Sequence, residues 1–221
     1  MIYGCDLSPE YQPGFDVDTA YDAGCRFLAV KLSDGTKGYD RYEEGIDVLD
    51  AARFGHRMVG IGYHFVRPDV SAVDQAVMFA RQLKRAGDAP GMLDIESGDA
   101  KALDLVREIH LNLVRDLGCR VAFTYLPRWW WGSIGSPSLA GLPTIWASRY
   151  VSNAGVEVEG SPQQIAQGIT PTSWETYGGK SLSVLQFTRK AKIGRYVMDA
   201  DAFVGTLADL EVMAYGRDGR P

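Results

Sequence analysis

Two carboxylates close the short apolar segment 91–96: Asp94 and Glu96 stand at positions i and i+2. Because side chains alternate faces along a β-strand, both acids would project from the same face, roughly 6.5 Å apart at their Cα atoms. A carboxylate at the end of a buried strand needs a partner or a shifted pKa. Two adjacent carboxyls in unequal surroundings can supply a proton donor and an anion, as acid/base hydrolysis requires.

The elements that must position this pair follow a repeating pattern. Short β-branched or aromatic runs predict strands at residues 2–6, 27–31, 58–65, 92–96, 121–125, 144–147 and 182–188. Amphipathic segments between them predict helices at residues 17–24, 39–55, 71–87 and 100–118. This alternation is typical of parallel βα units. We therefore expect an α/β fold, a TIM-like (β/α) barrel over residues 1–210, followed by a tail or linker at 211–221.

The second half of the expected barrel is less regular, because residues 152–177 fit neither pattern. In a βα barrel the reactive groups lie where the strands end, at the carboxyl side. The polar and aromatic residues at these positions are Asp6, Lys31, Asp34, Tyr63, His64, Asp94, Glu96, Thr124, Tyr125, Trp146, Arg149 and Gln186, and Asp199 and Asp201 follow a predicted turn. Acids, flat rings and amides together are the composition expected of a carbohydrate cleft.

Several of these residues have a purely structural interpretation. Asp6 could cap the following helix, and Lys31 could simply neutralise a buried acid. His64, between two aromatic residues, is better interpreted as a hydrogen-bonded core histidine than as a metal ligand. The run Trp129 to Trp131 could be a sugar platform, although packing of at least two of its rings is the safer interpretation.

Composition excludes several classes of function. The chain of 221 residues is 46% hydrophobic, which suits one large globular domain. Its net charge of −5 argues against binding to nucleic acid, which depends on clustered Lys and Arg. Residues 1–6 lack the pattern of a secretion signal, and no window is long enough for a membrane span, so we expect cytosolic synthesis without membrane insertion.

Other catalytic machinery is not indicated. The three cysteines, Cys5, Cys25 and Cys119, are widely spaced and are predicted to be reduced and buried. Cys5 should face away from its neighbour Asp6, so a thiol nucleophile is not expected. We find no phosphate-binding loop, nucleophile elbow, dinucleotide fingerprint or zinc-ligand spacing. The sequence therefore predicts a hydrolase without cofactor or metal.

A series of short motifs resembles the family 25 glycoside hydrolases, the lysozyme-type N-acetylmuramidases of bacteria and of phage lysins. The resemblance runs from about Gly4 to Phe203. Its motifs are Asp6-Leu7-Ser8 with Gln12, Val30-Lys31-Leu32-Ser33-Asp34-Gly35, Gly62-Tyr63-His64-Phe65, Asp94-Ile95-Glu96, Thr124-Tyr125, Trp146-Ala147-Ser148-Arg149-Tyr150, Gln186-Phe187-Thr188 and Asp199-Ala200-Asp201-Ala202-Phe203. Each motif alone is weak, but eight in order are specific.

The resemblance implies roles for the acids. Glu96 would be the general acid, and Asp94 would stabilise developing positive charge or orient the substrate's 2-acetamido group. Asp6 and Asp199 would complete an acidic floor, and crowding by like charges should raise the pKa of Glu96. The implied substrate is bacterial peptidoglycan, cut at the β-1,4 bond between N-acetylmuramic acid and N-acetylglucosamine. The residues expected to bind it are Tyr63, Tyr125, Trp146, Gln186, Lys31 and Asp34.

Three features depart from the family pattern: Leu185 replaces a common Trp, Asp34 replaces a common Glu, and the Trp129 to Trp131 run is unusual. Two alternatives therefore stay open, a glycan-binding barrel without turnover and a chitinase-like hydrolase of another acetamido glycan. The missing secretion signal favours the catalytic domain of a bacteriophage endolysin, a monomer that reaches the cell wall through a holin or by lysis.

Overall fold

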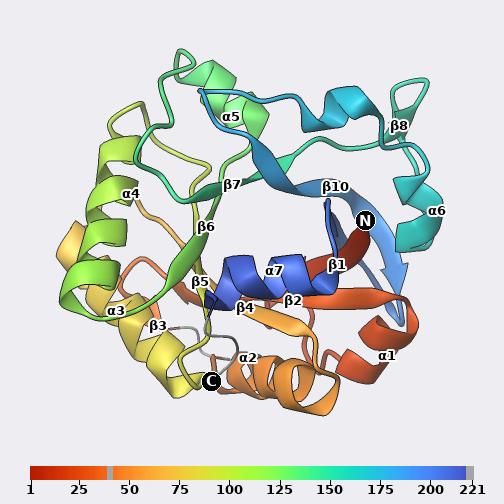
Figure 1. Cartoon of the computed structure of the whole chain (residues 1–221), viewed down its shortest axis with the longest axis horizontal. Helices are drawn as coiled ribbons and strands as arrows, with labels where there is room; N and C mark the ends of the chain where they lie inside the picture. Colours follow the sequence, from red (N-terminus) through yellow and green to blue (C-terminus); the bar gives the residue numbers. More distant parts are fainter. Residues whose placement is uncertain (39–41, 218–221) are drawn as a thin grey trace.

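A closed barrel of eight strands organises the chain (Figure 1). The computed structural model describes residues 1–38 and 42–217. The barrel strands are β1 (Ile2–Leu7), β2 (Cys25–Asp34), β4 (Val59–Phe65), β5 (Gly91–Asp94), β6 (Val121–Tyr125), β7 (Thr144–Ser148), β10 (Leu182–Ile193) and β11 (Tyr196–Phe203). They pair in this order, and β11 returns to β1. The expected α/β barrel and its seven predicted strands are confirmed.

The turn predicted before Asp199 and Asp201 is present, but it leads into an eighth strand, β11, that the sequence pattern did not predict. Strand β11 pairs antiparallel with both β10 and β1, while the other barrel pairings are parallel. A tight turn at Gly194, which has a φ of +57°, joins β10 to β11. The sequence hides this strand because two of its inward positions carry Asp199 and Asp201 rather than apolar residues.

Helices surround the barrel where the amphipathic segments predict them. They are α1 (Val17–Asp22), α2 (Tyr42–Asp50) with η1 (Ala51–Gly55), α3 (Ala72–Arg85), and α4 (Ala102–Leu111) with η2 (Asn112–Asp116). Residues 39–41 of one predicted helix lie outside the described residues. Ser71 begins α3 by accepting a hydrogen bond from the Asp74 amide, and Phe79 and Leu83 form its buried face.

The irregular segment contains only short elements. They are β8 (Ser152–Asn153), β9 (Val156–Glu157), α6 (Pro162–Ala166) and η3 (Pro171–Trp174). Two further short elements are β3 (Lys37–Gly38) and α5 (Arg128–Ser133). In Figure 1 the irregular segment crosses the upper right of the barrel rather than forming a full βα unit. The expectation of an irregular second half is confirmed.

Apolar side chains fill the inside of the barrel as well as the layer between sheet and helices. The inner cluster includes Phe27, Ile61, Phe123 and Phe203, all nearly inaccessible to solvent. Close packing here requires Gly4, because a Cβ at that position would lie 2.4 Å from the Phe27 ring. The barrel is therefore a packed core rather than a channel.

Helix α7 (Leu207–Tyr215) covers one end of this core. Leu210 and Ala214 are fully buried in the inner cluster, and the Gly60 amide donates to the Tyr215 hydroxyl at 3.2 Å. Gly60 lies near the start of β4, so α7 covers the end of the barrel opposite the predicted site. The boundary predicted at residue 210 therefore falls inside a helix, and Met213, Ala214 and Tyr215 beyond it pack with the barrel. Residues 218–221 of the expected tail are outside the described residues.

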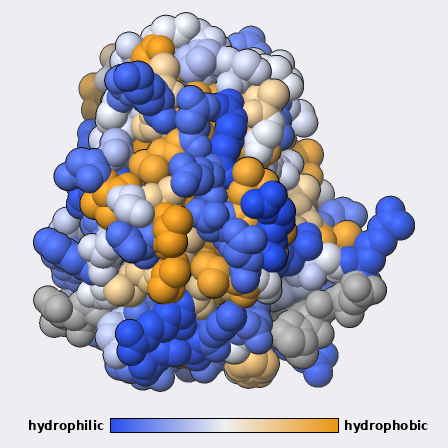
Figure 2. Space-filling view, turned by 90° about the vertical axis from the view of Figure 1, so that its left-hand side faces the viewer, coloured by the Kyte–Doolittle hydropathy of each residue, from blue (hydrophilic) through white to orange (hydrophobic). Residues whose placement is uncertain are grey.

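The outer face of α3 and α4, on the left of Figure 1, faces the viewer in Figure 2. Apolar side chains gather there among charged ones; Val73, Val77, Leu111 and Val114 are each between 42% and 53% exposed. Among the described residues, no helix combines the length and the apolar character that a membrane crossing would need.

The packing of α7 gives a first prediction. Leu210→Ala should lower the free energy of unfolding by about 2–5 kcal/mol, because it leaves a cavity in the inner cluster. Val212→Ala on the same helix is the matched control: that side chain is 50% exposed, so its loss should change stability by no more than about 0.5 kcal/mol. Urea unfolding followed by circular dichroism measures both, and equal effects would contradict the role given to α7.

Candidate active site

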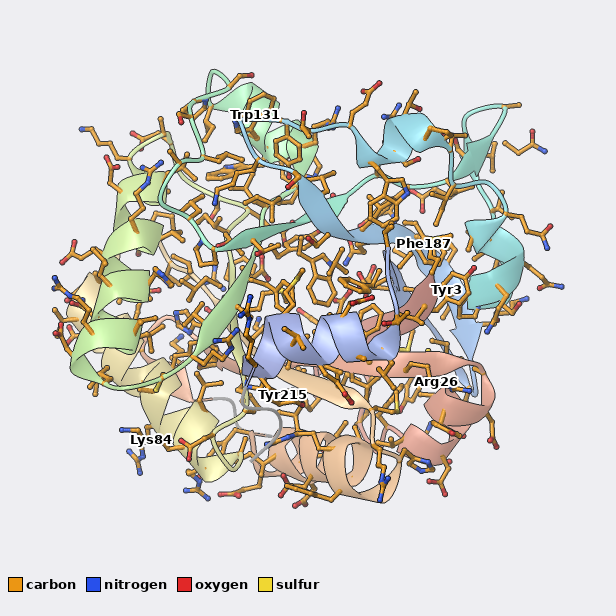
Figure 3. The ribbon with its side chains drawn as sticks, in the orientation of Figure 1. Tyr3, Arg26, Lys84, Trp131, Phe187 and Tyr215 are labelled. Carbon is orange, nitrogen blue, oxygen red and sulfur yellow. The ribbon has the colours of Figure 1, made fainter. Side chains whose placement is uncertain are left out.

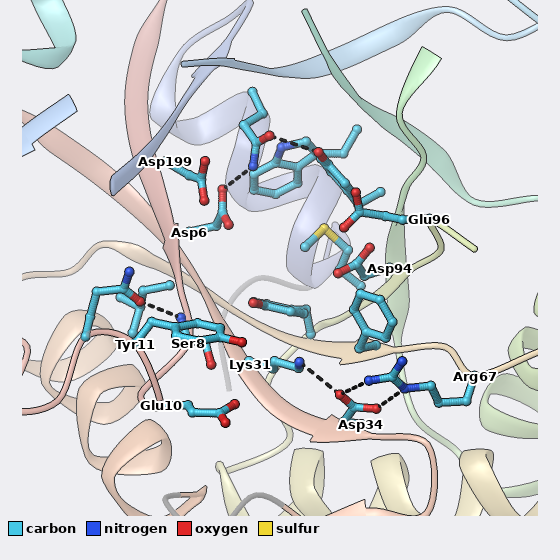
Figure 4. Close-up of a pocket in the computed structure, with 18 of the residues that line it drawn as sticks. Asp6, Ser8, Glu10, Tyr11, Lys31, Asp34, Arg67, Asp94, Glu96 and Asp199 are labelled. Atoms are coloured by element: carbon cyan, nitrogen blue, oxygen red, sulfur yellow. Dashed lines mark hydrogen bonds and ion pairs between the residues drawn. The ribbon is translucent and has the colours of Figure 1, made fainter. Parts of the chain in front are cut away.

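A cavity of about 510 Å³ opens at the carboxyl ends of the parallel strands (Figure 4). It is lined by Asp6, Leu7, Ser8, Glu10, Tyr11, Gln12, Lys31, Asp34, Tyr63, Phe65, Arg67, Met92, Asp94, Glu96, Tyr125, Trp146, Tyr150, Gln186 and Asp199. All ten residues predicted as catalytic or substrate-binding are in this set. Thr124, Arg149 and Asp201 are not.

Strand β5 and the residues that follow it present Asp94 and Glu96 to the cavity. Asp94 is its last residue, and the chain stays extended beyond it because the Ile95 amide donates to the Tyr125 carbonyl at 3.1 Å. Ile95 is fully buried in the outer layer, so Asp94 and Glu96 face inward together. Figure 4 shows both on one wall, with Asp6 and Asp199 across from them. The same-face prediction is confirmed.

The opposite wall comes from β1 and β11. Their register places Gly4 beside Asp201. Two residues further toward the cavity on each strand are Asp6 and Asp199, and both reach it. The structure thus brings the four predicted carboxyls together. Asp6 belongs to β1, and Asp16 caps α1 instead, so the helix-capping alternative for Asp6 is wrong.

Asp201 lies beneath the floor of the cavity and is fully buried. One of its carboxyl oxygens accepts a hydrogen bond from the Trp146 indole at 2.8 Å, and its side chain also hydrogen-bonds Asp6. Two carboxyls can share a hydrogen bond only if one of them carries a proton. Burial, followed by the charge of Asp6, raises the pKa of Asp201 well above its ordinary value, so Asp201 is the donor.

Gln186 joins Asp6 to two tyrosines. Its amide nitrogen donates to Asp6 Oδ2 at 2.9 Å, and its carbonyl oxygen accepts from the hydroxyls of Tyr125 and Tyr150, each at 2.9 Å. Burial raises the pKa of Asp6, but the hydrogen bonds from Gln186 and Asp201 oppose that shift. The pKa of Asp6 is still raised on balance, but among the four carboxyls Asp6, Asp94, Glu96 and Asp199 it is the one with two donors aimed at it and so the one best prepared to be an anion.

The other three carboxyls of the cleft, Glu96, Asp199 and Asp94, hold protons more strongly than ordinary carboxyls. Burial first, and the charge of Asp6 second, raise the pKa of Glu96 to about 7. Burial likewise leads the causes that raise the pKa of Asp199 to about 8 and that of Asp94 well above its usual range. The predicted rise for Glu96 is confirmed in direction. Its predicted cause, crowding by like charges, is secondary to desolvation.

A cationic pair of side chains borders the acids. Lys31 Nζ lies 3.1 Å from Asp34 Oδ2, and Arg67 Nη2 donates to the same oxygen at 2.8 Å. Burial raises the pKa of Asp34, but the hydrogen bond from Arg67 and the charge of Lys31 lower it by more, so Asp34 is an anion. The charge of Lys31 also opposes the pKa rise at Asp94 and Glu96. The interpretation of Lys31 as a partner of a buried acid is confirmed.

His64 is a core residue, as expected. Its Nδ1 lies 2.8 Å from the Ser33 hydroxyl and its Nε2 3.1 Å from the Gln75 amide oxygen. Burial lowers the pKa of His64 to about 4, so the ring is neutral. In the part of the chain that the structure describes, no three His, Cys, Asp or Glu side chains group as a metal site. Cys5, Cys25 and Cys119 are buried and free, as predicted.

The three consecutive tryptophans divide into different roles. Trp130 is buried, and the Trp131 indole donates to the Pro137 carbonyl at 2.8 Å and packs 5.1 Å from the Tyr177 ring. The packing of two rings is therefore confirmed. Trp129 is 62% exposed.

Sequence reasoning missed several residues of the cleft wall. Glu10 and Tyr11 come from the loop after β1, Arg67 from the loop after β4, and Tyr150 from the loop after β7. The same rule that located the strand ends could have found them, because loops after parallel strands form the rim of a barrel site.

The comparisons with known proteins agree with this geometry. The family model of the glycosyl hydrolases family 25 matches residues 5–194. An N,O-diacetylmuramidase of Chalaropsis sp. is 29% identical over 206 residues, which is 81% of this chain and 92% of that protein. An N,O-diacetylmuramidase of Arthroderma benhamiae is 28% identical over 189 residues, 73% of each chain.

Solved structures share the fold at lower identity. The catalytic domain of endolysin ply40 from bacteriophage P40 of Listeria monocytogenes superposes with a TM-score of 0.68 at 18% identity, covering 95% of this chain and 96% of that one. A family 25 glycosyl hydrolase from Bacillus anthracis gives 0.67 at 18% identity, covering 95% and 92%. With a family model that spans most of the chain and an acidic cleft at the barrel end, the protein belongs to the glycosyl hydrolases of family 25.

Proposed function

We propose that this glycoside hydrolase is a muramidase that cuts the β-1,4 bond between N-acetylmuramic acid and N-acetylglucosamine in bacterial peptidoglycan. The observation that carries the proposal is the position of Glu96, a carboxyl with a pKa of about 7 that lines the cleft opposite Asp6. A general acid must hold its proton near the working pH and face the bond that breaks. The names of the two curated relatives support the substrate.

In the proposed reaction Glu96 gives its proton to the glycosidic oxygen as the bond from that oxygen to the muramic acid C1 breaks. Positive charge develops at the ring, and Asp6 is the anion that faces it, because Gln186 and Asp201 donate to it. A water molecule then adds at C1 and gives a proton to the Glu96 carboxylate, which restores the acid. The products are a new reducing N-acetylmuramic acid end and a free 4-hydroxyl.

The sequence left two roles open for Asp94. Its raised pKa favours the neutral carboxyl, which can donate a hydrogen bond. One of its oxygens is buried without a hydrogen-bond partner among the described residues. We therefore assign Asp94 to orienting the 2-acetamido group of the substrate. Asp199 lies on the wall opposite Asp94 and has a pKa of about 8, so it would donate a hydrogen bond to a sugar hydroxyl.

The remaining cleft residues would bind the glycan. Tyr63 and Tyr125 supply rings and polar tips, and Gln186 fixes the hydroxyls of Tyr125 and Tyr150. Lys31 and Asp34 offer a charged edge to sugar hydroxyls. Trp146 is fully buried, so it forms the floor of the site.

The biological setting is part of the proposal. We infer that the substrate is the bacterial cell wall and that a monomer acts on it. We propose as the setting a phage endolysin released by a holin or by lysis, and the fold shared with the ply40 domain supports it.

Removal of the acid tests the assignment. Glu96→Gln should lower the rate of reducing-end release from purified cell walls by about 10² to 10⁴-fold, because the amide cannot donate the catalytic proton, while the melting temperature is maintained. Glu108→Gln, an exposed acid on α4, is the matched control and should keep full activity. Wild-type rates in Glu96→Gln would show that another group is the acid.

The products distinguish the proposal from its alternatives. Wild-type protein should release fragments with new reducing N-acetylmuramic acid ends, identified by borohydride reduction and mass spectrometry. Faster turnover of chitin oligomers than of cell walls would favour a hydrolase of another acetamido glycan. Binding to peptidoglycan without any reducing ends would favour a non-catalytic wall-binding barrel.

The pKa of Glu96 sets the expected pH dependence. Only the protonated acid is active, so kcat/KM should fall by about tenfold per unit as the pH rises above about 7. At low pH the rate should also fall, as Asp6 takes up a proton and loses its charge. Initial rates between pH 4 and 9, with circular dichroism at each pH to show that the fold is intact, measure this profile. A constant rate up to pH 9 would contradict the role of Glu96.

A further inference from the structure

A second cavity, of about 500 Å³, adjoins the acidic cleft. Its lining residues are Arg128, Trp129, Ser148, Arg149, Tyr150 and Glu175. Tyr150 lines both cavities, so the two lie next to each other on either side of this residue. The second cavity contains none of the acids assigned to catalysis. It would therefore contact a part of the substrate that lies away from the broken bond.

The helix that carries the exposed ring in this cavity is held in place by its neighbours. Trp129 is the second residue of the short helix α5, and the next two residues anchor that helix: Trp130 is 3% exposed, and the Trp131 indole donates to the Pro137 carbonyl. Figure 3 shows Trp131 in α5 at the top of the molecule. Trp129 is 62% exposed despite this anchoring. An exposed indole on an anchored helix at the rim suits the flat face of a sugar ring.

The charge of the second cavity differs from that of the cleft. Arg128 and Arg149 share one acid, Glu175, with nitrogen–oxygen distances of 3.5 and 3.8 Å. Two cations and one anion leave a net positive charge, whereas carboxyls dominate the neighbouring cleft. The arginines also donate to the carbonyls of Glu175 and Thr172, so they hold the η3 segment while facing the cavity. Such a site favours a ligand that carries a carboxylate.

We propose that this second cavity is a distal subsite for a muramyl residue of the same glycan strand, whose ring stacks on Trp129 and whose carboxylate faces Arg128 and Arg149. The proposal rests on the proposed muramidase function. The carboxylate could come from the lactyl group or from the attached peptide, and both sources share the same chemistry. The subsite would make the enzyme favour long, acidic strands over short oligosaccharides.

Binding to the non-hydrolysing Glu96→Gln protein tests the ring. Calorimetry with muramyl oligosaccharides of four and of eight sugars should show that adding Trp129→Ala weakens binding of the longer ligand on the order of tenfold and leaves the shorter one unchanged. Phe54→Ala, an aromatic side chain that is 65% exposed and lines neither cavity, is the control and should change neither. Equal affinities with and without Trp129 for the longer ligand would overturn the subsite.

A second arm tests the charge and identifies its source. Arg149→Gln should weaken binding of eight-sugar strands with free lactyl carboxylates and leave strands with amidated carboxylates unaffected. If only peptide-bearing strands respond, the peptide supplies the carboxylate. A merely structural role in holding η3 would weaken all ligands equally and would refute the charge assignment.

The failure of this inference differs from the failure of the proposed function. If the wild-type protein releases no reducing ends from peptidoglycan, the muramidase proposal is wrong, whatever Trp129 does. If the wild-type protein hydrolyses walls and the Trp129 variant binds long strands as its parent does, only the subsite is wrong.

Discussion

The antiparallel pairing of β1 with β11 is the constraint on which the site depends. It closes the barrel and sets the register that places Asp201 beside Gly4 and carries Asp199 and Asp6 to the rim. This pairing keeps Asp201 next to Asp6, and two carboxyls can share a hydrogen bond only if one of them holds a proton. The hydrogen bond between Asp201 and Asp6 is thus a product of strand pairing, and it gives Asp6 the donors that an anion needs.

Burial is the main reason that the other cleft acids hold protons near neutral pH. Asp94, Glu96 and Asp199 all have raised pKa values, and burial is the leading cause in each. A site built only on mutual repulsion would be sensitive to salt, whereas burial is not screened by ions. Packing around Glu96 is therefore the main reason that its pKa lies near neutral, and the charge of Asp6 raises that pKa further. Lys31, held by Asp34, limits the rise.

The strand-end acids Asp6, Asp34, Asp94 and Glu96 could be predicted because they follow or close apolar runs, and the barrel rule places such residues at one end. Strand β11 could not, because its inward acids replace the apolar alternation by which strands are identified. The donation of Trp146 to Asp201, and the network through Gln186, join residues about 40 to 180 positions apart, which local pattern does not encode. The sequence could not show which of the three tryptophans is exposed, because three identical neighbours give no periodic signal. The structure separates them by the burial of each ring.

Helix α7 has a kinetic consequence for proton exchange. It covers the barrel end opposite the cleft, and the packed inner cluster lies between it and the acids. In the part of the chain that the structure describes, the acids open to solvent at the cleft mouth, which a bound glycan would cover. The acids of an enzyme with glycan bound would therefore keep the protonation state that they had when the glycan bound. The value of kcat would then depend less on pH than kcat/KM does.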